Sequence, residues 1–95
     1  IWEFKAKDWV NSTSIKDDVV VLGCGNFLGN EGYTYALNLN TGNKIWEFKA
    51  KDNVWTTSIK DDVVVLGCIS GYTYALNLNT GRVIWEFKAK YGVKS

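Results

Sequence analysis

Two pairs of adjacent carboxylates are the groups in this sequence best suited to chemistry: Asp17-Asp18 and Asp61-Asp62. Paired carboxylates can hold a divalent cation or share the proton transfers of acid–base catalysis. Each pair, however, stands between two runs of β-forming residues, where aspartate hydrogen-bonds its own backbone and favours a turn. Histidine is absent, which removes imidazole as a base or ligand. We therefore predict turns at both pairs, with no catalytic residue and no metal site in the chain.

Cys24 and Cys68 are the two thiols, and each follows a Val-Val-Val-Leu-Gly run. They occupy equivalent positions in two repeat units, which in stacked sheets lie about 10 Å apart, against about 5.5 Å between the Cα atoms of a disulfide. We predict that they form no intrachain disulfide and behave as small buried apolar side chains. Two cysteines without histidine also make a poor zinc site.

The chain is organised around the heptapeptide Ile-Trp-Glu-Phe-Lys-Ala-Lys, which occurs at residues 1–7, 45–51 and 84–90. Its Trp, Phe and Ala alternate with charged residues, the period of two by which a strand shows one apolar and one charged face. Each copy is predicted to be a half-buried strand. The copies begin 44 and then 39 residues apart, which is close to the length of a four-stranded propeller blade.

Three further strands are predicted in each unit, and those of the first unit cover residues 12–15, 19–24 and 32–40. The first alternates small and polar residues, and the second is an uninterrupted apolar run, typical of a strand buried on both faces. The third places four large side chains on one face: Tyr33, Tyr35, Leu37 and Leu39. Gly42 then lies in a hairpin turn, where it is free to adopt a positive φ. The second unit repeats this pattern, with Ile69-Ser70 in place of residues 25–31.

These patterns predict an all-β fold: two four-stranded antiparallel propeller-type blades plus one extra outer strand, a partial or oligomer-completed β-propeller. Residues 1–95 form a single domain of two tandem repeats in this interpretation. Residues 1–44 hold the extra outer strand and the start of the first blade. Residues 45–83 hold the outer strand of the first blade and the start of the second. Residues 84–95 hold the outer strand of the second blade and a truncated tail, which looks like the opening of a third unit at Val93.

Charge and hydropathy exclude two classes of partner. Eleven basic residues are interspersed with ten acidic ones, giving a net charge of +1, so no basic groove for nucleic acid is expected. No apolar run approaches the roughly 20 residues of a membrane-spanning helix. The chain starts inside a strand pattern at Ile1, without an initiator methionine, so we expect that it has been processed or excised.

Residues 36–46 and 75–85 carry a more specific pattern, Ala-Leu-Asn-Leu-Asn-Thr-Gly followed by Trp. This pattern resembles the pyrroloquinoline-quinone-type β-propeller repeat, which ends in Ala-Leu-Asp, Thr-Gly and Trp. Asn38 and Asn77 stand where that family commonly has Asp. The resemblance covers essentially the whole chain and favours a periplasmic or extracellular location. It also implies that the motif tryptophans dock against a neighbouring blade, at Trp2, Trp46 and Trp85.

The quinone-dependent enzymes of this family use a calcium-coordinating cluster, a catalytic Asp and often adjacent cysteines. No counterpart of these groups is visible, so we expect no enzyme activity and no cofactor. One predicted surface holds instead the candidate interaction residues Asp8, Trp9, Asn11, Phe27, Leu28, Asn53 and Trp55, and the residues that differ between the two units cluster there. Aromatic residues beside asparagine suit a protein, peptide or glycan contact. Neutral variation in loops would give the same pattern.

Two functions compete. The first is a non-enzymatic structural or protein-interaction module that self-associates through blade faces and strand edges, as a homo-oligomeric ring or filament. The alternative is a fragment of a larger ligand-binding or quinone-dependent propeller. In a ring, residues 1–7 would compete with residues 84–90 of the preceding chain for one edge. One copy must then add a fifth strand, pair across chains or come free, whereas a sandwich of the two sheets would allow a monomer.

Overall fold

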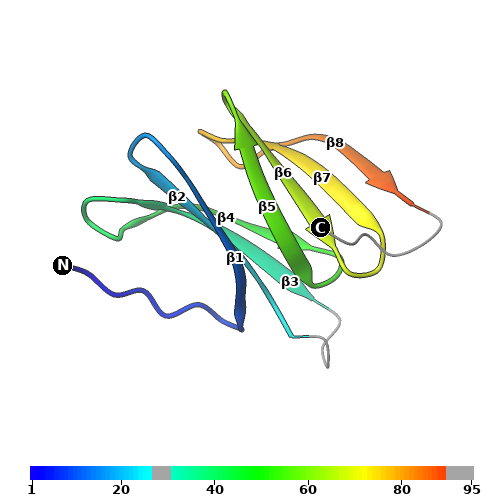
Figure 1. Ribbon diagram of the computed structural model, residues 1–95, viewed down its shortest axis with the longest axis horizontal. Helices are drawn as coiled ribbons and strands as arrows, with labels where there is room; N and C mark the ends of the chain where they lie inside the picture. Colours follow the sequence, from blue (N-terminus) through cyan, green and yellow to red (C-terminus); the bar gives the residue numbers. More distant parts are fainter. Residues whose placement is uncertain (27–30, 90–95) are drawn as a thin grey trace.

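The computed structural model describes residues 1–26 and 31–89 (Figure 1). Eight strands form two antiparallel sheets of four, and the strands of each sheet pair in chain order. Sheet 1 holds β1 (Val10–Lys16), β2 (Val19–Gly25), β3 (Gly32–Asn38) and β4 (Lys44–Ala50). Sheet 2 holds β5 (Val54–Lys60), β6 (Val63–Cys68), β7 (Tyr72–Asn77) and β8 (Val83–Lys88). The all-β class and the two four-stranded sheets predicted from the sequence are confirmed.

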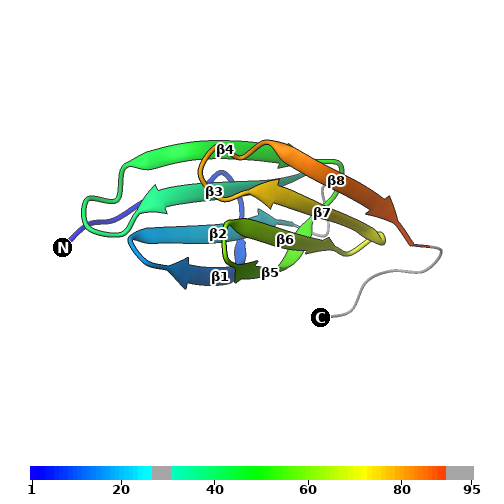
Figure 2. The ribbon, with the colours of Figure 1, turned by 90° about the horizontal axis from the view of Figure 1, so that it is seen from above.

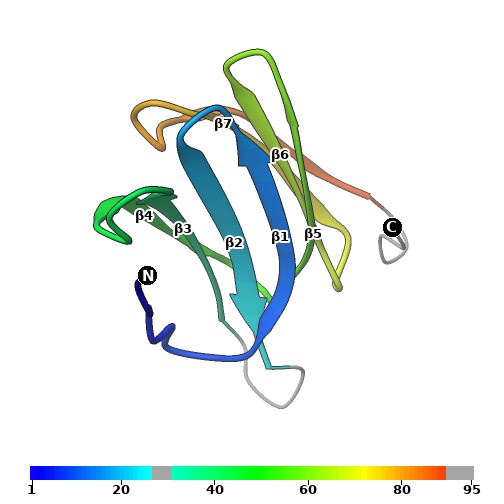
Figure 3. The same ribbon diagram turned by 60° about the vertical axis from the view of Figure 1, so that its left-hand side comes forward.

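The two sheets pack against each other with their inner strands, β1 and β5, side by side (Figures 2 and 3). The outer strands, β4 and β8, lie along the opposite edge (Figure 2). The N-terminus and β8 lie on opposite sides of the molecule (Figure 1). A helix long and apolar enough to cross a membrane is not found within the described part of the chain.

The turns confirm the predicted turn chemistry. Asp17 and Asp61 adopt φ of 53° and 54° in the two Asp-Asp turns, a conformation that aspartate tolerates better than most residues. In the turn before β4, the Asn38 side-chain oxygen accepts hydrogen bonds from the backbone N–H groups of Asn40 and Thr41, at 2.9 and 3.1 Å. Asparagine thus supplies the acceptor oxygen at a position where the repeat that the sequence resembles commonly has aspartate.

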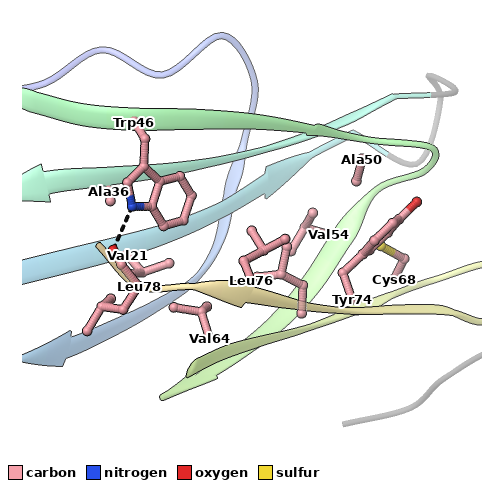
Figure 4. Close-up of a cluster of buried hydrophobic side chains, with 11 residues drawn as sticks. Val21, Ala36, Trp46, Ala50, Val54, Val64, Cys68, Tyr74, Leu76 and Leu78 are labelled. Carbon is pink, nitrogen blue, oxygen red and sulfur yellow. Dashed lines mark hydrogen bonds between the residues drawn. The ribbon is translucent and has the colours of Figure 1, made fainter. Parts of the chain in front are cut away.

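Each sheet has two different faces, because side chains alternate along a strand. The tyrosine face carries Cys24, Tyr33, Tyr35 and Leu37 in sheet 1, and Cys68, Tyr72, Tyr74 and Leu76 in sheet 2. The tryptophan face carries Val21, Ala36, Trp46 and Phe48 in sheet 1, and the equivalent Val65, Ala75, Trp85 and Phe87 in sheet 2. The main core forms where the tryptophan face of sheet 1 packs on the tyrosine face of sheet 2 (Figure 4).

The N-terminal segment, residues 1–7, was predicted to be a strand and is not one. Exposed and half-buried residues alternate along all seven positions, as the sequence pattern indicates. The other two copies of the heptapeptide each pair with the strand that precedes them in the chain: β4 pairs with β3, and β8 pairs with β7. The described chain offers the N-terminal segment no such strand, so it is held without strand pairing.

The other predicted strands are confirmed, with boundaries that differ from the expected ones by no more than two residues. β2 is buried along most of its length on both faces, as its unbroken apolar run indicates. The expected third unit at Val93 and the residues Phe27 and Leu28 lie outside the described residues.

Candidate functional site

The N-terminal segment lies on the tyrosine face of sheet 1. The Trp2 indole Nε1 donates a hydrogen bond of 2.5 Å to the Leu39 carbonyl. The backbone N–H of Lys7 donates to the Tyr35 hydroxyl at 3.3 Å. Between them, Phe4 meets the Tyr35 ring edge-on, with 5.1 Å between ring centroids. The segment is therefore anchored near both of its ends and in the middle.

β4 and the residue after it make the same contacts on the tyrosine face of sheet 2. Trp46 Nε1 donates a hydrogen bond of 2.7 Å to the Leu78 carbonyl (Figure 4). The Lys51 backbone N–H donates to the Tyr74 hydroxyl at 3.2 Å, and Phe48 meets the Tyr74 ring edge-on at 5.1 Å. The heptapeptide is thus a ligand of the tyrosine face, whether or not it is also part of a sheet.

A turn glycine makes room for each docked indole ring. Gly42 and Gly81 both have a φ of 76°, in the left-handed region that favours glycine. A Cβ added to Gly42 would lie 2.6 Å from the Trp2 ring, and one added to Gly81 would lie 2.7 Å from the Trp46 ring. Backbone conformation and the close approach of the ring both therefore require glycine at these turns.

An ion pair accompanies each docked copy at its C-terminal end. Lys7 Nζ lies 2.8 Å from Glu47, and Lys51 Nζ lies 2.8 Å from Glu86. Lys44 binds the second carboxylate oxygen of Glu47 at 2.8 Å. Hydrogen bonds from Lys44 and then Lys7 lower the pKa of Glu47, and its carboxylate raises the pKa of Lys7. Because the pairs are exposed to solvent, each contributes little to stability.

The third copy has the same residues but a different environment. Trp85 is 47 % exposed and Phe87 60 % exposed, whereas Trp46 is only 8 % exposed. Both exposed rings belong to the tryptophan face of sheet 2, which lies on the side of the molecule away from the N-terminal segment (Figure 1). Trp85 was expected to dock against a neighbouring blade, and no sheet covers it in the described chain. Two large apolar side chains are therefore exposed on one face of a single strand.

The inner strands join the two sheets through a row of hydroxyl groups. The Ser12 and Ser14 hydroxyls lie 2.9 and 2.7 Å from the Thr57 hydroxyl, and the Thr57 backbone N–H donates to Ser12 at 3.0 Å. A Cβ on Gly23 would lie 2.7 Å from the Val54 side chain, so glycine permits the close approach of β5. Val54 is fully buried as a result.

The residues of the predicted interaction surface have different environments. Trp9, which precedes β1, and Trp55, which lies in β5, are both exposed large side chains. Asp8 is half-buried and accepts a hydrogen bond from the Trp9 backbone. Asn11 is also half-buried and donates to the Gly25 and Val54 carbonyls, so its amide joins the two sheets.

The prediction that Asn53 lies on this surface is wrong, because its side chain is buried and the residue is only 2 % exposed. It lies where the end of β2 and the start of β3 approach the start of β5. A Cβ on Gly25 or Gly32 would lie within 3.0 Å of Asn53 atoms. The side chain is therefore part of the packing between the sheets.

Sequence reasoning did not identify the hydroxyl groups that hold the docked copies and the inner strands. Tyr35 and Tyr74 supply acceptors for a backbone N–H, and Thr57 supplies the centre of the row between β1 and β5. The signal for Tyr35 and Tyr74 was their identical Tyr-Thr-Tyr context in both units. A phenol repeated at equivalent core positions indicates a hydrogen-bonding partner, because a buried hydroxyl needs one.

Cys24 and Cys68 are both free and buried, which confirms that they form no disulfide with each other. Burial, with a smaller effect of Asp8, raises the pKa of Cys24 to about 11. Burial and Asp52 raise the pKa of Cys68 to about 12. Both groups are thiols at neutral pH and are poor nucleophiles. No group of three or more His, Cys, Asp or Glu side chains placed to hold a metal ion occurs among the described residues.

No protein-family model matches the chain. The uncharacterised protein MJECL23 of Methanocaldococcus jannaschii is 54 % identical over 44 residues, which cover 46 % of this chain and 5 % of that protein. The chain therefore spans a small part of the curated relative that it matches.

Solved structures match both sheets together. BamB from Moraxella catarrhalis superposes with a TM-score of 0.77 at 23 % identity, covering 90 % of this chain and 26 % of BamB. The computationally designed Ika4 protein gives 0.80 at 16 % identity, covering 93 % and 53 %. Sqt1 from Saccharomyces cerevisiae gives 0.76 at 20 % identity, covering 88 % and 22 %. BamB is a β-propeller of PQQ-like repeats and Sqt1 is a WD40 propeller, so the two sheets have the fold of two adjacent propeller blades.

Proposed function

We propose that the chain is a non-enzymatic interaction module that self-associates head to tail, with sheet 2 of one copy packing on sheet 1 of the next. The observation that carries the proposal is the contrast between Trp46, which a neighbouring sheet buries, and Trp85, which is exposed in a strand with the same Ile-Trp-Glu-Phe-Lys core. Identical side chains fit the same kind of surface. A second tyrosine face of the required kind exists on sheet 1, at the other end of the molecule.

The inner strands carry matching groups for the same arrangement. Ser58 stands in β5 where Ser14 stands in β1, and Thr13 stands in β1 where Thr57 stands in β5. Ser58 and Thr13 are both exposed in the single chain. Placing β5 of one copy beside β1 of the next would rebuild the row of hydroxyl groups between them.

The apolar positions of the inner strands support the same packing. Val10 is 47 % exposed, whereas its equivalent Val54 is fully buried between the sheets. Ile15 is exposed, whereas its equivalent Ile59 packs into the main core. A second copy that covered both side chains would stabilise the assembly by about 25 cal/mol for each Å² of apolar surface that it buried.

The residues that differ between the two units also fit this interface. Within one chain, Asn11 and Asn53 both approach Gly25, so the joint there is small and polar. At the corresponding places between two copies, three exposed apolar residues would meet: Trp55 and Ile69 from one copy, and Trp9 from the next. The contact between copies would then be aromatic, whereas the equivalent contact between the two sheets of one chain is polar, and this difference would make the two interfaces distinct.

The likeness to propellers supports closure of the assembly into a ring. Both sheets superpose together on BamB, Ika4 and Sqt1, so the angle between them is that of adjacent blades. Packing of the same two faces around a ring repeats one heterologous interface until it closes. The chain covers 53 % of Ika4 and 26 % of BamB, the shares expected if two or four copies formed rings of those sizes.

Size-exclusion chromatography with light scattering tests the proposal. We expect the mass to rise with micromolar concentration to a whole multiple of 10.7 kDa, and to fall to 10.7 kDa in Trp85→Asp. Ile84→Asp is the matched control, because the equivalent Ile45 stays 46 % exposed even where sheet 2 covers Trp46. A mass of 10.7 kDa at every concentration would overturn the proposal and assign the exposed face to a different polypeptide.

The second candidate is two blades within a larger ligand-binding or quinone-dependent propeller. It is favoured by the small shares that the chain covers of MJECL23, BamB and Sqt1. Titration of the chain with pyrroloquinoline quinone and calcium tests it directly. Tight, saturable binding would support this candidate, and the absence of binding by the folded chain would leave the interaction module as the function.

A further inference from the structure

We infer that the tyrosine face of sheet 1 is a binding site for an extended peptide of the type Trp-x-Phe-x-Ala. In the single chain the N-terminal segment occupies this site, and in the assembly β8 of a second copy displaces it. The inference rests on the proposed head-to-tail association and adds an internal competitor for the interface.

The two docked copies show that the site recognises the heptapeptide itself. The N-terminal segment and β4 place the indole, the phenyl ring and the backbone N–H after Ala on the same three groups: a carbonyl, a tyrosine ring and a tyrosine hydroxyl. Only β4 is also held by strand pairing. Side-chain contacts and one backbone hydrogen bond therefore suffice to position the sequence.

The N-terminal segment is the more easily removed of the two. Trp2 and Ala6 are half-buried, whereas their counterparts Trp46 and Ala50 are 8 % and 2 % exposed. The segment pairs with no strand of the described chain, so its release breaks no sheet. Its binding is favoured instead by attachment to β1, which gives it a high effective concentration at the site.

β8 offers the same side chains in a form that costs less to bind. Trp85 and Phe87 are already fixed in a strand by pairing with β7, so docking them orders fewer torsions than docking a free segment. A second copy also brings β5 to the exposed Val10 and Ile15, which the N-terminal segment leaves uncovered. The segment therefore sets a threshold concentration below which copies stay apart.

A labelled synthetic peptide, Ile-Trp-Glu-Phe-Lys-Ala-Lys, tests the site. Binding is measured by fluorescence anisotropy in a Trp85→Asp chain, which lacks the competing tryptophan of β8. Adding Trp2→Ala weakens the internal competitor, and we expect the peptide to bind this double variant about tenfold more tightly or better. Equal affinity for the two variants, or no saturable binding to the double variant, overturns the inference.

Two matched controls address the location of the site. Gly42→Ala places a Cβ where the indole docks and should abolish most of the peptide binding. Gly81→Ala has the same φ and the same backbone strain but obstructs Trp46 on sheet 2, so peptide binding should persist. A control peptide in which alanine replaces the tryptophan should bind neither the Gly42→Ala chain nor the Gly81→Ala chain. Loss of binding in Gly81→Ala but not in Gly42→Ala contradicts the assignment to sheet 1.

The thiols report whether the variants stay folded. Cys24 packs in the cluster that the N-terminal segment covers, and Cys68 lies in the core between the sheets. In the Trp2→Ala double variant, a thiol reagent should modify Cys24 faster than in Trp85→Asp, while Cys68 stays protected. If Cys68 also reacts, Lys7→Glu replaces Trp2→Ala, because it sets a like charge beside Glu47 without removing an apolar side chain.

The inference and the proposed function fail in different ways. Peptide binding is measured in a Trp85→Asp background, so it does not depend on self-association. A wild-type chain that assembles but has no peptide site overturns this inference alone. A chain that binds the peptide but stays at 10.7 kDa overturns displacement by a second copy together with the proposed function.

Discussion

Trp46 and Trp85 occupy the same place in two strands of identical core sequence, Ile-Trp-Glu-Phe-Lys, and differ in burial. Trp46 donates to the Leu78 carbonyl within the main core, whereas Trp85 is nearly half exposed. Each strand pairs with the preceding strand of its own sheet in the same register. The difference therefore comes entirely from the presence of a following sheet. Burial in a repeat structure depends on the neighbour as much as on the residue.

Trp2 gives an intermediate case. It makes the same hydrogen bond as Trp46, to the Leu39 carbonyl, but belongs to a segment without strand pairing and is half-buried. The three copies thus separate the two kinds of support that a docked strand receives. β4 has both pairing and a neighbouring sheet, β8 has pairing alone, and the N-terminal segment has a neighbouring sheet alone.

The largest expected effect tests the first contrast. Trp46→Ala should lower the free energy of unfolding by about 3 to 5 kcal/mol, because it opens a cavity in the core between the sheets. Trp85→Ala should lower it by less than about 1 kcal/mol in the dilute chain, and Trp9→Ala likewise, because both side chains are exposed. Urea denaturation checks the values, and equal midpoints for Trp46→Ala and Trp85→Ala would refute the assignment of faces.

The glycine turns sharpen the comparison of Trp46 with Trp2. Gly81→Ala should destabilise the chain by about 2 to 4 kcal/mol, because strain at the positive φ adds to overlap with a buried ring. Gly42→Ala should cost about 1 to 2 kcal/mol, because the half-buried Trp2 can move away. Thermal unfolding of both variants measures the difference. A larger cost for Gly42→Ala would mean that the N-terminal segment is held as firmly as β4.

The inner strands offer a matched pair of threonines. Thr57→Val should cost about 1 to 2 kcal/mol, because the hydroxyls of Ser12 and Ser14 lose their common partner between the sheets. Thr13→Val, at the equivalent exposed position, should leave the stability of the dilute chain almost unchanged and weaken association instead. Denaturation and light scattering on the same samples separate the two outcomes. Equal destabilisation by both substitutions would contradict the proposed interface.

The smallest expected effect concerns acid sensitivity at the N-terminal segment. Hydrogen bonds from Lys44 and Lys7 lower the folded-state pKa of Glu47 below its ordinary value of 4.5. The stabilisation is therefore present above 4.5 and is lost as the pH falls through the lowered pKa. Glu47→Gln should remove this small part of the acid dependence. Denaturation midpoints above and below 4.5 provide the measurement, and an unchanged pH dependence in Glu47→Gln would show that the ion pairs carry no stability.

The repeat pattern predicted most of the fold, because alternation and turn chemistry are local properties. The Tyr33 and Tyr35 face, the Asp17 turn and the positive φ of Gly42 follow from residues within a few positions of each other. The environments of the docking residues were harder to predict from the sequence. The exposure of Trp85 and the burial of Asn53 depend on which sheets are present and how closely they approach. The strand that holds Trp85 does not carry that information, since the strand that holds Trp46 has the same Ile-Trp-Glu-Phe-Lys core.

The near identity of the repeats also has a consequence for how the chain folds. β3 and β7 share the sequence Tyr-Thr-Tyr-Ala-Leu-Asn, so each can pair with the common Ile-Trp-Glu-Phe-Lys core of β4 or β8 through the same side chains. Only the short turns at residues 39–43 and 78–82 select the native partner, because closing a short loop costs less entropy than closing a long one. The choice of pairing partner therefore depends on loop length and on the rate of hairpin formation, and not on differences in side-chain contacts between the strands. In concentrated refolding mixtures the nearest matching strand belongs to another molecule, so the yield of correctly paired hairpins should fall as protein concentration rises.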